Sequence, residues 1–196
     1  MGKLNPVTDS KYFIAIVPPS PVYEEVDELK HYFNDQYQSK GALKSPPHIT
    51  LHMPFLWKEK NEAKLMDKLG QFSDDRQSFS IELKDFDAFE PRVIFIHIES
   101  NELLTKLQTD LTKFCKAELQ LFNAKYKDQP FHPHLTIAFR DLKKDQFKKA
   151  WEEFESKSFV RSFLCESLSL LKHDGKKWEA IKQFSLSNDH DISKLV

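Results

Sequence analysis

The chain contains the sequence Pro47-His48-Ile49-Thr50-Leu51 and repeats its pattern at Pro133-His134-Leu135-Thr136-Ile137. Each copy reads proline, histidine, aliphatic residue, threonine, aliphatic residue. Successive side chains of a β-strand alternate between its two faces, so the histidine and threonine share one face and the aliphatic residues share the other. The pattern predicts two strands that each bury one face and present an imidazole and a hydroxyl on the opposite face.

If these two strands lie side by side or face each other, four polar side chains meet at one place. Two imidazoles can exchange protons near neutral pH, and two hydroxyls can donate hydrogen bonds to developing charge. Taken singly, either histidine would be interpreted as a structural residue whose threonine neighbour reflects β propensity. The repetition of the whole pattern favours a shared site for acid/base chemistry on a phosphate ester, formed by His48, Thr50, His134 and Thr136.

Strand and helix patterns follow the same order around the two motifs. A strand and a helix precede each motif strand, and a helix and further strands follow it. Because the motifs lie close to half the chain length apart, we expect a duplication with a pseudo-two-fold axis. Strands are predicted at 11–18, 48–55, 77–89, 93–98, 134–140, 159–165, 167–172 and 178–184, and helices at 21–37, 60–72, 102–121 and 144–156.

The composition is that of a globular protein and excludes several classes. With 196 residues, 40% of them hydrophobic, the chain predicts one domain over residues 1–196, and a monomer is the default expectation. A net charge of −1 argues against a protein that coats duplex DNA. No apolar run is long enough to span a membrane, and residues 1–10 lack the pattern of a secretion signal. Two cysteines do not make a disulfide framework, so we expect a soluble cytoplasmic protein.

The chain resembles the two-histidine (2H) phosphoesterase superfamily, which includes the bacterial 2′-5′ RNA ligase or RNA 2′,3′-cyclic phosphodiesterase group. The resemblance rests on the two motifs, on an opening strand that ends in two prolines, and on a middle strand after another proline. Two such motifs in the same apolar context are far more specific than one. The stretches concerned are His48-Ile49-Thr50, His134-Leu135-Thr136, Phe13-Ile14-Ala15-Ile16 with Pro18-Pro19, and Pro91-Arg92-Val93-Ile94-Phe95.

This resemblance implies an α+β, bilobal fold in which antiparallel sheets line a central groove and helices lie outside. It also implies a phosphodiesterase without metal or cofactor, acting on a 2′,3′-cyclic or 2′-5′ bond of a nucleotide or RNA end, with ligation as the reverse reaction. His48 and His134 would then be general base and general acid. Thr50 and Thr136 would bind the non-bridging phosphate oxygens. The sequence does not fix which histidine is the base, or the exact substrate.

Three further residues share strand parity with the motif histidines and are candidate substrate contacts. His52 follows His48 by four residues, His132 precedes His134 by two, and Arg140 follows it by six. A guanidinium suits a phosphate, although a surface charge at a strand end explains Arg140 equally well. The remaining histidines, His97 among them, have no comparable neighbours and are interpreted as ordinary polar residues.

Two alternatives to a two-histidine enzyme stay open from the sequence. One is a metal site, because His48, His52, His132 and His134 form two close pairs and histidine is a common zinc ligand. Threonine, however, occupies the alternating positions where such a site would place a carboxylate. The other is a module that binds nucleotides or RNA ends without turnover, which would not need two titratable imidazoles.

Overall fold

The computed structural model describes residues 9–122 and 130–187, and every strand and helix predicted from the sequence is present in it. The prediction that residues 1–10 lack a secretion signal concerns mostly residues 1–8, which lie outside the described range. The strands are β1 Asp9–Ile16, β2 Ile49–Lys58, β3 Phe79–Phe89, β4 Val93–Ile98, β5 His134–Ala138, β6 Val160–Cys165, β7 Ser167–His173 and β8 Trp178–Ser185. The helices are α1 Val22–Tyr37, α2 Glu62–Asp74, α3 Glu102–Leu119 and α4 Lys144–Phe154, with short 3₁₀ turns at Ala42–Lys44 and Glu59–Asn61.

One curled antiparallel sheet organises the fold, with the strand order β6-β3-β4-β5-β2-β1-β7-β8. The two motif strands, β5 and β2, are neighbours at its centre, with three strands on each side. Each is flanked by the strand that the repeat predicts, β4 beside β5 and β1 beside β2. The order therefore agrees with the predicted pseudo-two-fold axis, which passes between the motif strands.

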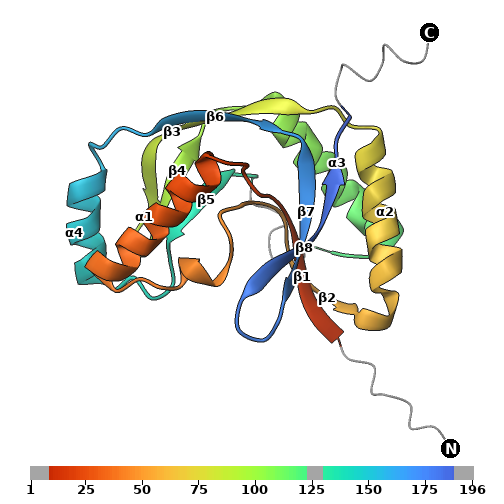
Figure 1. Cartoon of the computed structure of the whole chain (residues 1–196), viewed down its shortest axis with the longest axis horizontal. Helices are drawn as coiled ribbons and strands as arrows, with labels where there is room; N and C mark the ends of the chain where they lie inside the picture. The colour runs from red at the N-terminus through yellow and green to blue at the C-terminus, as the bar shows by residue number, and fades with distance from the viewer. Residues whose placement is uncertain (1–8, 123–129, 188–196) are drawn as a thin grey trace, which may run out of the picture.

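The helices divide between the two halves of the sheet and give the molecule its two lobes (Figure 1). Helices α1 and α4 lie over the half with β5 and β6, whereas α2 and α3 lie over the half with β2, β7 and β8. The lobes are interleaved, because α1 follows β1 in the chain but packs on the other half. Strands β6 and β7, between which only Glu166 lies, carry the chain across the top of Figure 1 from one lobe to the other.

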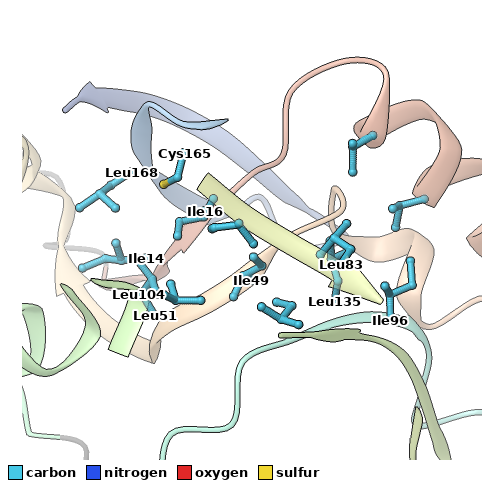
Figure 2. Close-up of a cluster of buried hydrophobic side chains, with 14 of the residues drawn as sticks. Ile14, Ile16, Ile49, Leu51, Leu83, Ile96, Leu104, Leu135, Cys165 and Leu168 are labelled. Carbon is cyan, nitrogen blue, oxygen red and sulfur yellow. The ribbon is translucent and has the colours of Figure 1, made fainter. Parts of the chain in front are cut away.

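The hydrophobic core lies between the helices and one face of the sheet. In Figure 2 the aliphatic side chains of both motif strands, Ile49 and Leu135, gather with those of Ile14, Ile16 and Ile96 from the neighbouring strands. All five are at most 1% exposed. Because alternate residues point the other way, the motif histidines and threonines are directed to the face that the helices do not cover.

Strand β2 contains a β-bulge directly after its motif. Between two paired positions β1 advances by one residue, from Ala15 to Ile14, while β2 advances by two, from Thr50 to His52. A bulge of this kind changes which face the following side chains occupy. Leu51 and His52 are consequently both buried, at 2% exposure each.

Strand β5 repeats this irregularity at the corresponding point. Its partner β4 steps from Phe95 to Ile94 while β5 steps from Thr136 to Ala138. Ile137 and Ala138 are both fully buried in the core cluster. The duplication thus extends to the position of the bulge, which the alternating sequence pattern does not reveal.

The loops next to the motif strands are tied together by one carboxylate. Asp141, shortly after β5, accepts hydrogen bonds from the Ser39 hydroxyl at 3.1 Å and from the backbone amides of Lys40 and Gly41 at 3.0 and 3.1 Å. A side chain at Gly41 would place its Cβ only 2.7 Å from the Phe139 carbonyl oxygen, so glycine permits this close approach. The contact fixes the entry to β2 relative to the exit from β5.

None of the helices in the described part of the chain combines the length and the apolar character that crossing a membrane requires.

Candidate active site

The four motif side chains lie on one face at the centre of the sheet. Strands β2 and β5 pair in antiparallel orientation with Ile49 beside Leu135. Continuing that register by one residue in each direction sets each motif histidine opposite the threonine of the other motif. The resulting cross-strand pairs are His48 with Thr136 and Thr50 with His134.

Both motif histidines are held by the same local contact. The Nδ1 atom of His48 is 2.7 Å from the Pro46 carbonyl oxygen, and that of His134 is 2.8 Å from the His132 carbonyl oxygen. A carbonyl oxygen only accepts hydrogen bonds, so Nδ1 carries the proton and donates it in both cases. The proline between the two bonded residues restricts the preceding backbone to extended conformations. Each ring therefore has a fixed orientation and keeps Nε2 for chemistry.

Aromatic rings from the flanking strands support each imidazole. The Phe13 ring centre, on β1, lies 4.9 Å from that of His48. On the other half, Phe95 of β4 and Phe89 of β3 lie 5.1 and 5.2 Å from His134. Packing against these rings removes water from the imidazoles and limits their movement.

Burial lowers the pKa of both motif histidines. The pKa of His48 falls to about 4, mainly because the charged ring would lose solvation, with further contributions from the positive charge of Lys30 and from His134. The pKa of His134 is also lowered, again mainly by burial and then by His132. The contribution of His134 to the lowered pKa of His48 agrees with the two rings lying near each other, and burial favours the neutral form of both imidazoles.

A buried lysine lies on the His48 side of the site. Lys30, on α1, is 1% exposed, and its Nζ donates a hydrogen bond to the Ser45 carbonyl oxygen at 2.5 Å and lies 3.5 Å from the Asp27 carboxylate. Burial lowers its pKa to about 8, so it stays largely protonated at neutral pH. Its charge opposes protonation of His48, whereas the neighbouring group that lowers the pKa of His134 is another imidazole.

The three additional candidates have different positions. His132 is exposed beside the site, with its ring centre 6.2 Å from that of His134 and 5.2 Å from that of Phe89. The prediction that His52 shares the face of His48 is wrong, because the bulge directs it to the core, where its Nδ1 contacts the Met53 carbonyl oxygen and its Nε2 has no partner within the described residues. Burial lowers the pKa of His52 as well.

The parity argument for Arg140 is also wrong, since β5 ends at Ala138 rather than at residue 140. Arg140 adopts a left-handed backbone conformation, with φ of 65°, and its guanidinium carbon lies 5.1 Å from the Phe139 ring centre. It is exposed near the end of the motif strand, so a role in binding substrate stays a prediction.

Sequence reasoning missed His97, which lies on the same face as His134. In the β4–β5 register His97 is directly opposite His134, whereas its neighbours Ile96 and Ile98 belong to the core. The signal was present in the alternation of Phe95 and His97 with buried isoleucines along the middle strand. Because α3 and the residues that follow it separate His97 from His134 in the chain, only the strand register brings the two together.

Among residues 9–122 and 130–187, no group of three or more histidine, cysteine, aspartate or glutamate side chains is arranged to hold a metal ion. The His48, His52, His132 and His134 set considered from the sequence is divided by the bulge, which directs His52 away from the others.

Comparison with known proteins identifies a family of similar sequences and a shared fold. The profile of the 2′-5′ RNA ligase superfamily matches residues 18–177, most of the chain. The RNA 2′,3′-cyclic phosphodiesterase of Bacillus subtilis is 31% identical over 147 residues, which cover 71% of this chain and 76% of that protein.

Solved structures share the fold at lower sequence identity. The crystal structure of the Thermus thermophilus protein TT0787 superposes with a TM-score of 0.62 at 19% identity and covers 92% of this chain and 100% of that chain. E. coli LigT, crystallised with 3′-AMP, gives a TM-score of 0.61 at 18% identity, with 92% and 99% covered. These likenesses establish a common α+β architecture.

Proposed function

We propose that this chain, which belongs to the 2′-5′ RNA ligase superfamily and is therefore a phosphoesterase, acts on a nucleotide or an RNA end. It cleaves a 2′,3′-cyclic or 2′-5′ phosphodiester by two-histidine acid/base catalysis. The observation that carries the proposal is the matched pair of imidazoles, each with Nδ1 bound to a carbonyl and Nε2 left free on one face of the sheet. Displacement at phosphorus needs one group that removes a proton and one that supplies a proton, and this pair provides both.

We assign His48 as the general base and His134 as the general acid for hydrolysis. Burial, with the positive charge of Lys30 as a smaller contribution, favours the neutral form of the His48 ring, which can accept a proton. No lysine is among the causes that lower the pKa of His134, and on this difference we assign His134 the proton in the bound state. Binding of an anionic phosphodiester between the rings raises both pKa values, and the difference in surroundings decides which ring takes the proton.

In the proposed reaction His48 Nε2 removes a proton from water as its oxygen attacks phosphorus. The bond from phosphorus to one ribose oxygen breaks, and His134 Nε2 gives its proton to that oxygen, which leaves a phosphate monoester and a free hydroxyl. Thr50 and Thr136 donate hydrogen bonds to the non-bridging oxygens, where negative charge grows in the transition state. In ligation of a cyclic end the 5′-hydroxyl of a second strand takes the place of water: His48 removes its proton as it attacks phosphorus, and His134 gives a proton to the ribose oxygen that leaves.

The named relatives support a nucleotide as substrate. The B. subtilis protein is called an RNA 2′,3′-cyclic phosphodiesterase, and crystal structures of E. coli LigT contain 3′-AMP, NADP⁺ or ATP. We therefore propose a nucleotide or RNA end for this chain. The positive charge of Lys30 near His48 suits an anionic ligand such as a nucleotide.

The test is a screen of nucleoside 2′,3′-cyclic phosphates, RNA with a cyclic end and 2′-5′-linked oligonucleotides, with and without a chelator. Product analysis by phosphorus NMR records which ribose oxygen is released. The expected result is turnover that survives chelation and a bell-shaped pH dependence of kcat/KM. Absence of turnover on the whole panel, together with nucleotide binding, would instead favour a binding module, and loss of activity with the chelator would favour metal catalysis.

A further inference from the structure

His97 is a polar side chain on the site face that the two-histidine reaction does not use. It lies on β4, directly opposite His134 in the register, and is only partly exposed. Its Nδ1 atom is buried and has no hydrogen-bond partner in the described part of the chain. Buried polar atoms are normally paired. Because this nitrogen is closed to solvent, a ligand can meet the His97 ring only through its exposed part.

His132 is the second unused imidazole in the same place. Its ring centre lies 6.5 Å from that of His97 and 6.2 Å from that of His134. The ring is held by edge contacts with Phe89 and Phe95, whose centres are 5.2 and 5.8 Å away. An exposed histidine packed in this way has a defined position without a hydrogen bond from its side chain. His97 and His132 thus form a fixed pair beside His134, which we call the outer histidine pair.

The other half of the site lacks this pair. Strand β1 pairs with β2 so that Ile16 is beside Ile49, which sets Val17 opposite His48, where β4 has His97. The residue two before His48 is Pro46, where the other motif has His132. The duplicated framework therefore carries apolar residues at both positions on one side and imidazoles at both on the other.

We propose that the outer histidine pair binds a second phosphate of the substrate, the one next to the scissile phosphate along a nucleotide chain. The inference rests on the proposed function, because it places the scissile phosphate between β2 and β5. From there to β4 is about one and a half strand spacings, roughly 7 Å, a separation that neighbouring phosphates of a nucleotide chain can span. An imidazole N–H at the exposed edge of a ring can donate a hydrogen bond to a phosphate oxygen.

The charges around the outer histidine pair permit an anion. Beyond β4 the Lys84 ammonium lies 3.1 Å from the Glu99 carboxylate, so these two charges compensate each other. Asp87 is on β3 opposite Phe95, two residues along β4 from His97, and its carboxylate accepts a hydrogen bond from the Ala88 amide. The substrate class that follows is an oligonucleotide end or a 5′-phosphorylated nucleotide rather than a nucleotide with a single phosphate.

The experiment compares two ligands that differ by one phosphate, 3′-AMP and adenosine 3′,5′-bisphosphate, by isothermal titration calorimetry on the full chain. The variants are His97→Val, which installs the residue found opposite His48, and His132→Asn, at an exposed position outside the strands, with folding of both checked by circular dichroism. His31→Gln is the matched control, because His31 is 60% exposed on α1 and outside the site. Wild type and control should bind the bisphosphate about tenfold more tightly, and each variant should reduce that ratio to about two or less.

Kinetics separates this inference from the proposed function. Adenosine 2′,3′-cyclic phosphate with and without a 5′-phosphate should show the preference in KM, with kcat changed much less. Equal affinity of the wild type for both ligands, or variants that keep the wild-type ratio, would overturn the second-phosphate subsite. If the wild type turns over neither cyclic substrate but the affinity ratio behaves as expected, the reaction assignment fails while the subsite stands.

Discussion

The two halves of the site have the same local structure but different surroundings. Each motif histidine donates Nδ1–H to the carbonyl two residues earlier, and each motif strand bulges directly after its threonine. Around His48 there are a buried lysine and apolar neighbours, whereas around His134 there are other imidazoles. A duplicated pentapeptide therefore fixes how the two rings are oriented. What differs is the environment, and the environment sets how readily each ring takes a proton.

Replacing either motif histidine is the strongest way to test this comparison. His48→Ala and His134→Ala should each lower kcat by a factor on the order of 10³ or more, because each removes one of two proton transfers. In the pH profile of kcat/KM, His48→Ala should remove the acidic limb and His134→Ala the alkaline limb. Circular dichroism confirms folding. Loss of the same limb in both variants would contradict the assignment of roles.

The threonines test whether the two halves contribute equally to charge stabilisation. Thr50→Val and Thr136→Val keep the shape of the side chain but remove a hydroxyl donor, so each should lower kcat on the order of 10²-fold with a smaller change in KM. Thr→Ser variants of both positions keep the donor and serve as controls. Nearly wild-type rates for one valine variant would show that only one half of the site holds the phosphate oxygens.

Lys30 tests the electrostatic difference directly. In Lys30→Met the buried positive charge near His48 is lost, so the pKa of His48 should rise from about 4 towards its ordinary value. A higher pKa means that more of the base is protonated in mild acid. The value of kcat/KM at pH 5 should therefore fall several-fold relative to wild type while that at pH 7 changes little. Lys30→Arg keeps the charge, so the acidic limb of its pH profile of kcat/KM should match that of the wild type. An unchanged pH profile for Lys30→Met would show that Lys30 does not influence His48.

The smallest effect concerns the support of the bulge in β2. The Gln108 amide on α3 donates hydrogen bonds to the Leu51 carbonyl oxygen at 3.3 Å and to the Thr112 hydroxyl at 3.0 Å. Gln108→Met should lower the free energy of unfolding by about 1 kcal/mol, measured by urea denaturation, because the carbonyl at the bulge loses its donor. Thr112→Val, which removes only the other partner, is the control, and should cost less.

Much of the fold was predictable because its elements have strong patterns. The strand at 93–98 was predicted with its observed limits, and the long helix from Glu102 ends two residues before the predicted limit. The errors lie where a tertiary contact overrides alternation. Strand β5 was predicted to continue to residue 140 but ends at Ala138, and His52 was assigned to the wrong face. Both errors come from the assumption of an uninterrupted period of two.

By itself the sequence determined the orientation of the two motifs, because alternation puts Ile49 and Leu135 into the core and the histidines and threonines on the opposite face. It also determined that the two motifs are equivalent, since they share one pattern. Tertiary structure alone decided which groups surround them. The bulges, the approach of Lys30 from α1 and the register that sets His97 beside His134 all depend on contacts between segments far apart in the chain, and no local pattern specifies such contacts.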